Sequence, residues 1–238
     1  MLKKLVSRVG RQLENLNHKR FIRSHEKADL KLRSGLALRK LLDEYEFESV
    51  LDVGCGSGEH SERFLSAGKR VTAVDYGNSH YFRQNRGRID VQIGNFNEME
   101  FDTQFDCVWC SHVLEHQLNV QDFLTKLSAT VREGGVLAIT VPPLKHRIAG
   151  GHVSLWNGGL LLYRMVLAGI DCREARLLAY NYNISALVRK HSISVLGELE
   201  YDRGDIRKIQ PYLPPSLDYL KDDPVDMPFD GAILRLNW

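Results

Sequence analysis

Apolar positions along this chain follow two spacings, which alternate from about residue 49 onward. Short apolar runs typical of buried strands lie near residues 49–53, 70–74, 90–93, 105–110 and 135–141. Between them, apolar residues recur every three or four positions, as in amphipathic helices, near residues 58–67, 79–86, 120–131 and 157–168. This alternation predicts an α/β fold with a doubly wound, parallel sheet. Two later runs, 173–180 and 184–190, are expected to form a closing pair of strands.

The N-terminal segment has a helical pattern of another kind. Basic residues lie opposite a stripe of six apolar residues, namely Leu2, Leu5, Val6, Val9, Leu13 and Leu16. One interpretation is a helix that lies on a membrane surface and is attracted to anionic lipid. The other, which the sequence favours, is a helix that caps the domain and carries ordinary solvated charge.

The C-terminal segment is rich in proline. From Tyr201 onward it holds five of the seven prolines, Pro211, Pro214, Pro215, Pro224 and Pro228. Such a density predicts an irregular extension that wraps over the domain. Residues 231–238 become apolar again and are expected to dock as a strand.

Composition and charge narrow the class of protein. Of the 238 residues, 43% are hydrophobic and 26% are charged, as in an ordinary globular protein. No apolar run is long enough to cross a bilayer and the N-terminus lacks a secretory-type stretch, so a cytoplasmic location is expected. The net charge of +2 combines +9 over residues 1–40 with −7 over the rest. Because this basic surplus is local, nucleic-acid binding is not expected.

The four cysteines do not form a recognisable framework. Cys107 and Cys110 have C-x-x-C spacing, but residues three apart on a strand point to opposite faces of the sheet. No second pair is present to complete a tetrahedral zinc site. A zinc or redox role is therefore not expected.

A glycine-rich turn follows the first core strand. The turn contains Gly54, Gly56 and Gly58 and begins two residues after Asp52, and Asp75 closes the next strand 21 residues after Gly54. A strand, a tight glycine turn, a helix and an acidic strand end are typical of a nucleoside-binding crevice. The spacing differs from the G-x-G-x-x-G of dinucleotide folds, and the turn has no Lys or Arg for a phosphate. The pattern therefore favours a ligand with a ribose and an amino-acid tail over NAD.

Four blocks of the chain resemble the class I S-adenosylmethionine-dependent methyltransferases. Leu51–Gly58 resembles their first motif, and Asp75 stands where their ribose-binding acid stands. Phe105–His116 resembles their fourth strand and the loop after it, and Leu127–Pro142 resembles the next helix and fifth strand. The resemblance implies a Rossmann-like, seven-stranded sheet and S-adenosylmethionine as the cofactor.

Nine residues are candidates for cofactor binding. We expect the glycines to let the backbone approach the ligand, and the Asp75 carboxylate to accept both ribose hydroxyls. Asp52, an acid in an apolar strand, needs a partner that the cofactor's ammonium group could supply. Tyr76 follows Asp75 and is expected against the adenine, and the resemblance places Asn95 and Phe96 at the adenine edge and Ser111 beside the methionine part. The full set is Asp52, Gly54, Gly56, Gly58, Asp75, Tyr76, Asn95, Phe96 and Ser111.

Two histidines are candidate catalytic bases, because imidazole titrates near neutral pH. His152 follows the fifth strand, where many small-molecule methyltransferases carry a histidine, and His116 is the second candidate. His112, Glu115 and His116 also match the H-x-x-E-H of inverted zinc proteases, but here they follow a strand. Some quinone-precursor O-methyltransferases bind a divalent metal through Glu-x-x-Glu-His at this place. Since His112 replaces the first Glu, no metal is expected.

The sequence thus predicts S-adenosylmethionine-dependent methyl transfer, with O-methylation of a small molecule or a saccharide-type metabolite as the first choice. The Asn-Pro-Pro-Tyr signature of amide N-methylation is absent. The alternatives are a non-catalytic cofactor-binding interaction protein and a methyltransferase that acts on a macromolecule or a lipid. The expected division is N-terminal basic helices or a lid over 1–45, the cofactor-binding core over 46–192, and the extension over 193–238.

Overall fold

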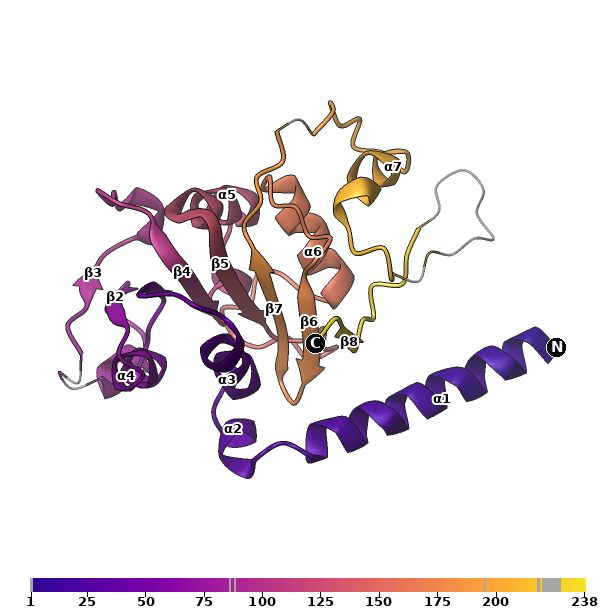
Figure 1. Cartoon of the computed structure of the whole chain (residues 1–238), viewed down its shortest axis with the longest axis horizontal. Helices are drawn as coiled ribbons and strands as arrows, with labels where there is room; N and C mark the ends of the chain where they lie inside the picture. Colours follow the sequence, from indigo (N-terminus) through magenta and orange to yellow (C-terminus); the bar gives the residue numbers. More distant parts are fainter. Residues whose placement is uncertain (1, 86, 88, 195, 218, 220–227) are drawn as a thin grey trace.

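The computed structural model has one eight-stranded sheet in the order β3-β2-β1-β4-β5-β7-β6-β8 (Figure 1). It describes residues 2–85, 87, 89–194, 196–217, 219 and 228–238, with side chains from residue 10 onward. The fold is the predicted Rossmann-like α/β fold, but the expected count of seven strands is wrong. A short eighth strand near the C-terminus extends the sheet beyond the closing pair.

Five parallel strands form the first part of the sheet, and three antiparallel strands complete it. The parallel strands are β1 (Ser49–Val53), β2 (Arg70–Asp75), β3 (Gln92–Ile93), β4 (Phe105–Ser111) and β5 (Val131–Val141). The others are β6 (Arg176–Tyr180), β7 (Asn183–Arg189) and β8 (Arg235–Leu236). The closing pair and the docking of the C-terminal residues as a strand are thereby confirmed.

Helices cover both faces of the sheet, because the central strands alternate their side chains between two apolar clusters. Cys107 and Trp109 of β4 point to a cluster with α3 (Gly35–Glu44) and α4 (Glu59–Ser66). Val108 and Cys110 point to the larger cluster with α5 (Val120–Thr130) and α6 (Gly158–Leu167). The two cysteines of the C-x-x-C pair thus lie on opposite faces, both buried.

The helix expected near 79–86 is only a short 3-10 turn over Phe82–Gln84. Gly77 and Gly87 bracket this stretch with φ values of 81° and 78°, a left-handed conformation that interrupts a helix on either side. The hydroxyl of Ser79 accepts a hydrogen bond from the Phe82 amide and caps the single turn. Local polar residues and glycines therefore outweigh the helical spacing of the apolar positions.

The described part of the C-terminal segment is more regular than expected. It contains α7 (Asp205–Ile209), a 3-10 turn at Gln210–Tyr212 and β8. Ile209, Leu213 and Leu217 are buried in the larger cluster. A wholly irregular extension is therefore not what the structure shows, and Pro224 lies outside the described residues.

The N-terminal helices α1 (Leu2–Arg23) and α2 (Lys27–Lys31) precede the core. Helix α1 touches the rest of the molecule near its C-terminal end and then extends past it (Figure 1). Among the described residues, no helix combines the length and apolar character that crossing a membrane requires.

Candidate active site

The carboxyl ends of the parallel strands meet at one edge of the sheet. Register places Val53 of β1 beside Val74 of β2 and Cys110 of β4, and Ser111 of β4 beside Thr140 of β5. In open α/β sheets this edge is where ligands bind. The structure therefore brings the glycine turn, Asp75 and the loop after β4 to a common edge.

The glycine turn requires backbone conformations that other residues rarely adopt. Gly54, Gly56 and Gly58 have φ values of 73°, 53° and 83°. The Gly54 amide donates to the Val74 carbonyl at 2.8 Å, which fixes the turn against the end of β2. A Cβ on Gly54 would lie 2.3 Å from Cγ2 of Val113 in the loop after β4. The turn is thus packed closely against the start of the loop that follows β4.

Asp75 lies at the end of β2, half-buried under the turn. Its two carboxylate oxygens accept hydrogen bonds from the Gly56 and Gly77 amides, each at 2.9 Å. A carboxylate offers about four lone-pair positions, so one acceptor position per oxygen stays open. This arrangement fits a ribose that donates two hydroxyl hydrogens, and the hydrogen bond from Gly56 also holds the turn against the end of β2.

Asp52 is 1% exposed, and the Ser61 hydroxyl of α4 donates to it at 2.6 Å. Burial raises the pKa of Asp52 to about 7, against the effect of the Ser61 hydrogen bond. A nearby ammonium group would lower this pKa and compensate the buried charge. The site therefore fits a cofactor with a cationic amino-acid tail.

The remaining four candidates differ in their availability. Tyr76 is 53% exposed beside Asp75. The Asn95 amide group is engaged on both sides, accepting from the Asn97 amide and donating to Glu98. The ring of Phe96 packs in the core, and Ser111 shares a 2.7 Å hydrogen bond with Ser34. Tyr76 is thus the most accessible of these side chains.

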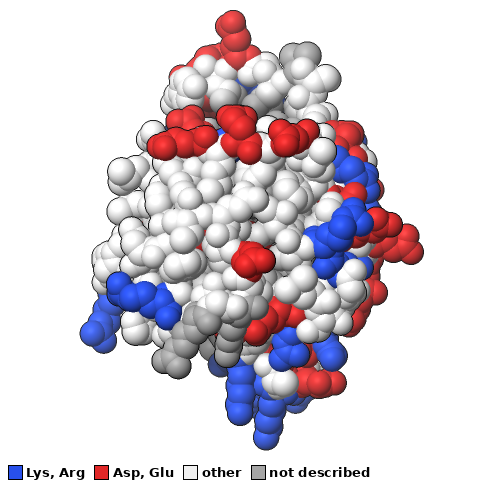
Figure 2. Space-filling view, turned by 90° about the vertical axis from the view of Figure 1, so that its left-hand side faces the viewer, with Lys and Arg blue, Asp and Glu red and all other residues white. Residues whose placement is uncertain are grey.

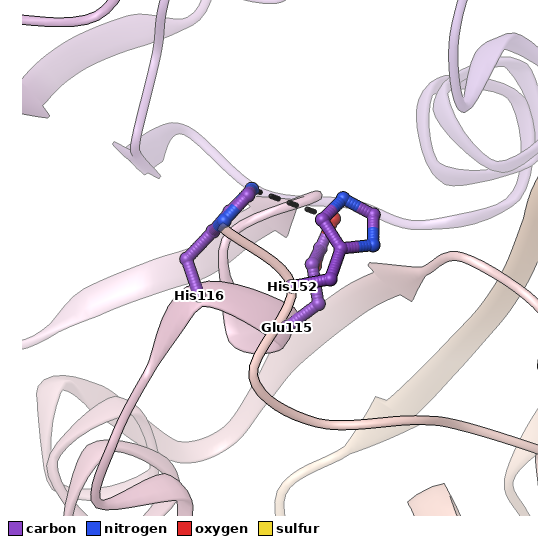
Figure 3. A group of neighbouring side chains, drawn as sticks. All are labelled: Glu115, His116 and His152. Atoms are coloured by element: carbon purple, nitrogen blue, oxygen red, sulfur yellow. Dashed lines mark ion pairs between the residues drawn. The ribbon is translucent and has the colours of Figure 1, made fainter. Parts of the chain in front are cut away.

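The two candidate bases lie side by side although 36 positions separate them in the sequence (Figure 3). The ring centroids of His116 and His152 are 5.0 Å apart, with one ring edge-on to the other. The Val153 amide donates to the Glu115 carbonyl at 2.9 Å, which ties the loop after β5 to the loop after β4. Burial lowers the pKa of His152, so this ring is neutral at pH 7.

The orientation of His116 leaves one nitrogen available. Its Nδ1 lies 2.8 Å from the carbonyl oxygen of Gly151, an acceptor, so Nδ1 carries the hydrogen. In the neutral ring Nε2 then holds the lone pair. That Nε2 is 3.9 Å from Oε1 of Glu115 (Figure 3). A proton taken up at Nε2 would therefore face a carboxylate.

Glu115 is a functional candidate that sequence reasoning treated only as a metal ligand. It is fully buried, and its Oε2 has no hydrogen-bond partner among the described residues. Its Oε1 is 3.1 Å from Nδ1 of His112. The close spacing of His112, Glu115 and His116 in the sequence pointed to a site. Only the fold shows that the Glu115 carboxylate faces the rings of both histidines.

His112 holds Glu115 in place from the other side. The Asn183 side-chain nitrogen donates to the Tyr180 carbonyl, which identifies Oδ1 of Asn183 as the acceptor of this side chain. Oδ1 accepts hydrogen bonds from the Ser34 amide and from Nε2 of His112. His112 has a φ of 58°, a strained conformation that is common at functional sites.

Glu115, His116 and His152 also have the composition of a possible metal site. One ligand atom from each lies within 4.8 Å of the others. Imidazole and carboxylate ligands suit several divalent transition metals. The same three groups can equally serve as a base with its counter-charge.

Two hollows lined by described residues bear on the location of the site. A small one adjoins His152 and is lined by residues that include Pro142, Ile148, Trp156 and Tyr182. A wider one of about 1300 Å³ lies at the opposite, amino edge of the strands. Two ion pairs lie within its lining, Arg132 with Asp106 at 2.7 Å and Arg70 with Glu48 at 2.9 Å. The smaller hollow is the one next to the candidate chemistry.

Comparison with known proteins agrees with this geometry. Residues 51–139 match the family described as methyltransferase domain. The ubiquinone biosynthesis O-methyltransferase of Rickettsia bellii is 33% identical over 97 residues, 38% of this chain and 40% of that protein. The protein of the same name from Rickettsia conorii is 28% identical over 162 residues, 59% of this chain and 56% of that one. The chain thus spans about two fifths to just over half the length of these relatives.

Among solved structures, the 1,6-didemethyltoxoflavin-N1-methyltransferase of Burkholderia thailandensis has the same fold. That protein was determined with 1,6-didemethyltoxoflavin and S-adenosylhomocysteine bound. The TM-score is 0.55 at 19% identity, over 76% of this chain and 90% of that chain. This likeness shows that the two chains share a Rossmann-like fold. The match of residues 51–139 to the methyltransferase domain agrees with the resemblance to the S-adenosylmethionine-dependent class that the sequence shows.

Proposed function

We propose that the protein transfers a methyl group from S-adenosylmethionine to a hydroxyl oxygen of a small molecule or a saccharide-type metabolite. The observation that carries this proposal is His116, whose Nδ1 is held by a carbonyl and whose Nε2 faces a buried carboxylate. An O-methyltransferase needs such a base if its acceptor must lose a proton. The similarity to relatives named as O-methyltransferases supports the same choice.

The cofactor residues act by binding and orientation. When bound, S-adenosylmethionine supplies an activated methyl group, so the protein mainly aligns donor and acceptor. Asp75 would hold the ribose and Asp52 the ammonium group, while the turn of Gly54, Gly56 and Gly58 lets the backbone approach. Tyr76 would lie against the adenine. Asn95, Phe96 and Ser111 complete the proposed set, with Phe96 acting from within the core.

The acceptor residues act on a proton. Nε2 of His116 takes the hydroxyl proton, and Nδ1 stays bonded to the Gly151 carbonyl. The imidazolium so formed is stabilised by Glu115, which His112 holds in position. His152, neutral at pH 7, borders the hollow beside it. The sequence ranked His152 first, but we propose it as the second base, because His116 is the histidine whose two nitrogens have a carbonyl and a carboxylate as neighbours.

We propose that this proton transfer needs no metal, because His116 serves as the base and the Glu115 carboxylate stabilises the charge that His116 acquires. Turnover should then persist after treatment with EDTA and passage over a chelating resin. Loss of turnover that a divalent metal restores would show instead that Glu115, His116 and His152 coordinate an ion.

The three-part division into 1–45, 46–192 and 193–238 is also part of the proposal. Residues 1–45 would act as a lid or support at the cofactor edge, as the contact between Ser34 and Ser111 suggests. Limited proteolysis with and without S-adenosylhomocysteine tests this: protection of the 1–45 region by the ligand is expected, and equal cleavage would contradict a lid.

The experiment for the proposed function uses S-adenosylmethionine labelled in its methyl group. The protein is incubated with separate pools of phenols, saccharides and amines, and labelled products are identified by mass spectrometry. Label in a hydroxyl-bearing acceptor, abolished in a His116→Ala variant, is expected. Label only in amines, or equal labelling by the variant, would contradict the proposed base.

Two other outcomes correspond to the alternative functions. Tight binding of S-adenosylhomocysteine, with no label in any small-molecule pool and none in the proteins or lipids of an extract, would indicate a cofactor-binding interaction protein. Label in the protein or lipid fraction alone would indicate a macromolecular or lipid acceptor.

A further inference from the structure

We propose that helix α1 binds an anionic lipid surface. This proposal is independent of the acceptor and of the identity of the base. It rests on how α1 is attached, on which of its faces is left open, and on the charge that it carries.

The attachment of α1 involves one face near its C-terminal end. Nε2 of His18 donates to the Ala179 carbonyl of β6 at 2.6 Å. One turn further on, Phe21 and Ile22 pack against the small cluster of Leu36, Leu178 and Tyr180. The helix is therefore fixed to the sheet by residues 18–22, while residues 10–17 are all exposed.

The two described residues of the apolar stripe, Leu13 and Leu16, point away from the attached face. At about 100° per residue, Leu13 and Leu16 lie roughly 140–160° around the helix axis from His18. Both side chains are 56% exposed. Leu2, Leu5, Val6 and Val9 continue the stripe in the sequence at spacings of three and four. A capping helix would turn this stripe toward the core, so the structure argues against that interpretation.

The charge of α1 fits an anionic surface rather than a second copy of this chain. The helix carries seven Lys or Arg residues and one acid, Glu14. Two copies of so basic a helix would repel each other, whereas anionic lipid attracts each basic residue near its surface. Figure 2 shows Lys and Arg projecting from the lower end of the molecule, the level at which α1 and α2 lie in Figure 1.

The position of α1 also places the acceptor side near the same surface. Its anchor at Ala179 is next to the β6–β7 hairpin, whose Tyr182 stacks on His112 and lines the small hollow. In the loop after β5, Leu144 and Ile148 are 58% and 62% exposed. Exposed apolar side chains and a basic amphipathic helix are both typical of proteins that lie on membranes.

The test is co-flotation of the full chain with vesicles of phosphatidylglycerol and phosphatidylcholine, compared with vesicles of phosphatidylcholine alone. Binding to the anionic vesicles, weakened by 0.5 M salt, is expected. Lys3→Gln with Lys4→Gln should lower the partition coefficient about fivefold per charge, roughly 30-fold for the pair. Leu13→Glu with Leu16→Glu should abolish binding, because the apolar stripe can no longer enter the interface.

The matched control is Leu65→Glu, a substitution of the same kind at a residue of α4 that is 49% exposed. It should bind anionic vesicles like the wild type. Unchanged affinity for S-adenosylhomocysteine verifies that each variant is folded. Equal flotation with both vesicle types, or no effect of the Leu13 and Leu16 substitutions, would overturn the proposal. So would a dimer in sedimentation that those two substitutions convert to a monomer without any vesicle binding.

Discussion

The two halves of the candidate active site are built by different means. On the cofactor half, Gly54, Gly56 and Asp75 form a turn held by backbone hydrogen bonds. On the acceptor half, His116 and His152 are side chains on two loops, joined through Glu115. The first half is held by hydrogen bonds of backbone amides, and the second depends on a few side-chain contacts.

This difference predicts separable effects of substitution. A change in the cofactor half should alter folding stability and cofactor affinity together, since the same hydrogen bonds serve both. A change in the acceptor half should alter the rate of the chemical step and leave cofactor affinity nearly unchanged. The predictions below test whether the two halves separate in this way.

The largest effect is expected for His116→Ala. Removing the base should lower kcat by about 10²–10⁴-fold, while the Kd for S-adenosylhomocysteine stays within about twofold. Steady-state kinetics with the identified acceptor, together with calorimetry, provide both numbers. His191→Ala is the control, because His191 is an exposed histidine paired only with Glu133 at 3.7 Å. A variant at position 116 with wild-type kcat would transfer the role to His152.

Gly54→Ala should damage the cofactor half through its backbone. Its φ of 73° costs an alanine about 1–2 kcal/mol, and the contact with Val113 adds overpacking of about 1–3 kcal/mol. The free energy of unfolding should therefore fall by roughly 2–5 kcal/mol, with cofactor affinity reduced as well. Urea titration measures the first and calorimetry the second.

Gly68→Ala separates the two causes. Gly68 has a similar φ of 76°, but a Cβ there meets nothing within 4 Å. It should lose only about 1–2 kcal/mol and keep wild-type cofactor affinity. If Gly54→Ala and Gly68→Ala lose the same unfolding free energy and neither loses cofactor affinity, the close packing of the glycine turn does not contribute to cofactor binding.

A smaller effect is expected for Asp52→Asn, and it should depend on pH. The folded-state pKa of about 7 is above the ordinary value of 3.8. Below pH 3.8 both states are protonated; between 3.8 and 7 the unfolded state alone releases its proton, so stability falls as pH rises. Relative to the wild type, the variant should gain roughly 1–3 kcal/mol between pH 4 and pH 7. A gain that is the same at both pH values would show that burial of Asp52 is not the cause.

The cofactor half could be predicted from the sequence because its signals are local. Val50–Val53, the glycines and Asp75 lie within one strand-turn-helix-strand unit, and each element there has its own apolar spacing. The expected helix near 79–86 failed for a local reason as well, since glycines with positive φ enclose it. The eighth strand was expected only as a docked segment, because pairing with β6 is a long-range contact.

The acceptor half could be predicted only as a set of candidate residues. The bond from His116 to the Gly151 carbonyl spans 35 positions, and that from His112 to Asn183 spans 71. Apolar periodicity carries no information on such pairs, which depend on where the loops meet after folding. Likewise the outward direction of the α1 stripe follows from the anchor at His18, which no local pattern indicates.

The most direct test of the account is calorimetric titration of S-adenosylhomocysteine into the wild type, Asp75→Ala and His116→Ala. The wild type should bind with micromolar affinity or better, about −8 kcal/mol, and NAD should give no saturable signal. Asp75→Ala should bind at least about tenfold more weakly, because the ribose loses hydrogen bonds to a charged group. His116→Ala should bind like the wild type. Equal affinity in all three proteins, or loss of affinity in His116→Ala alone, would contradict a cofactor site at the glycine turn and a separate acceptor site at the histidines.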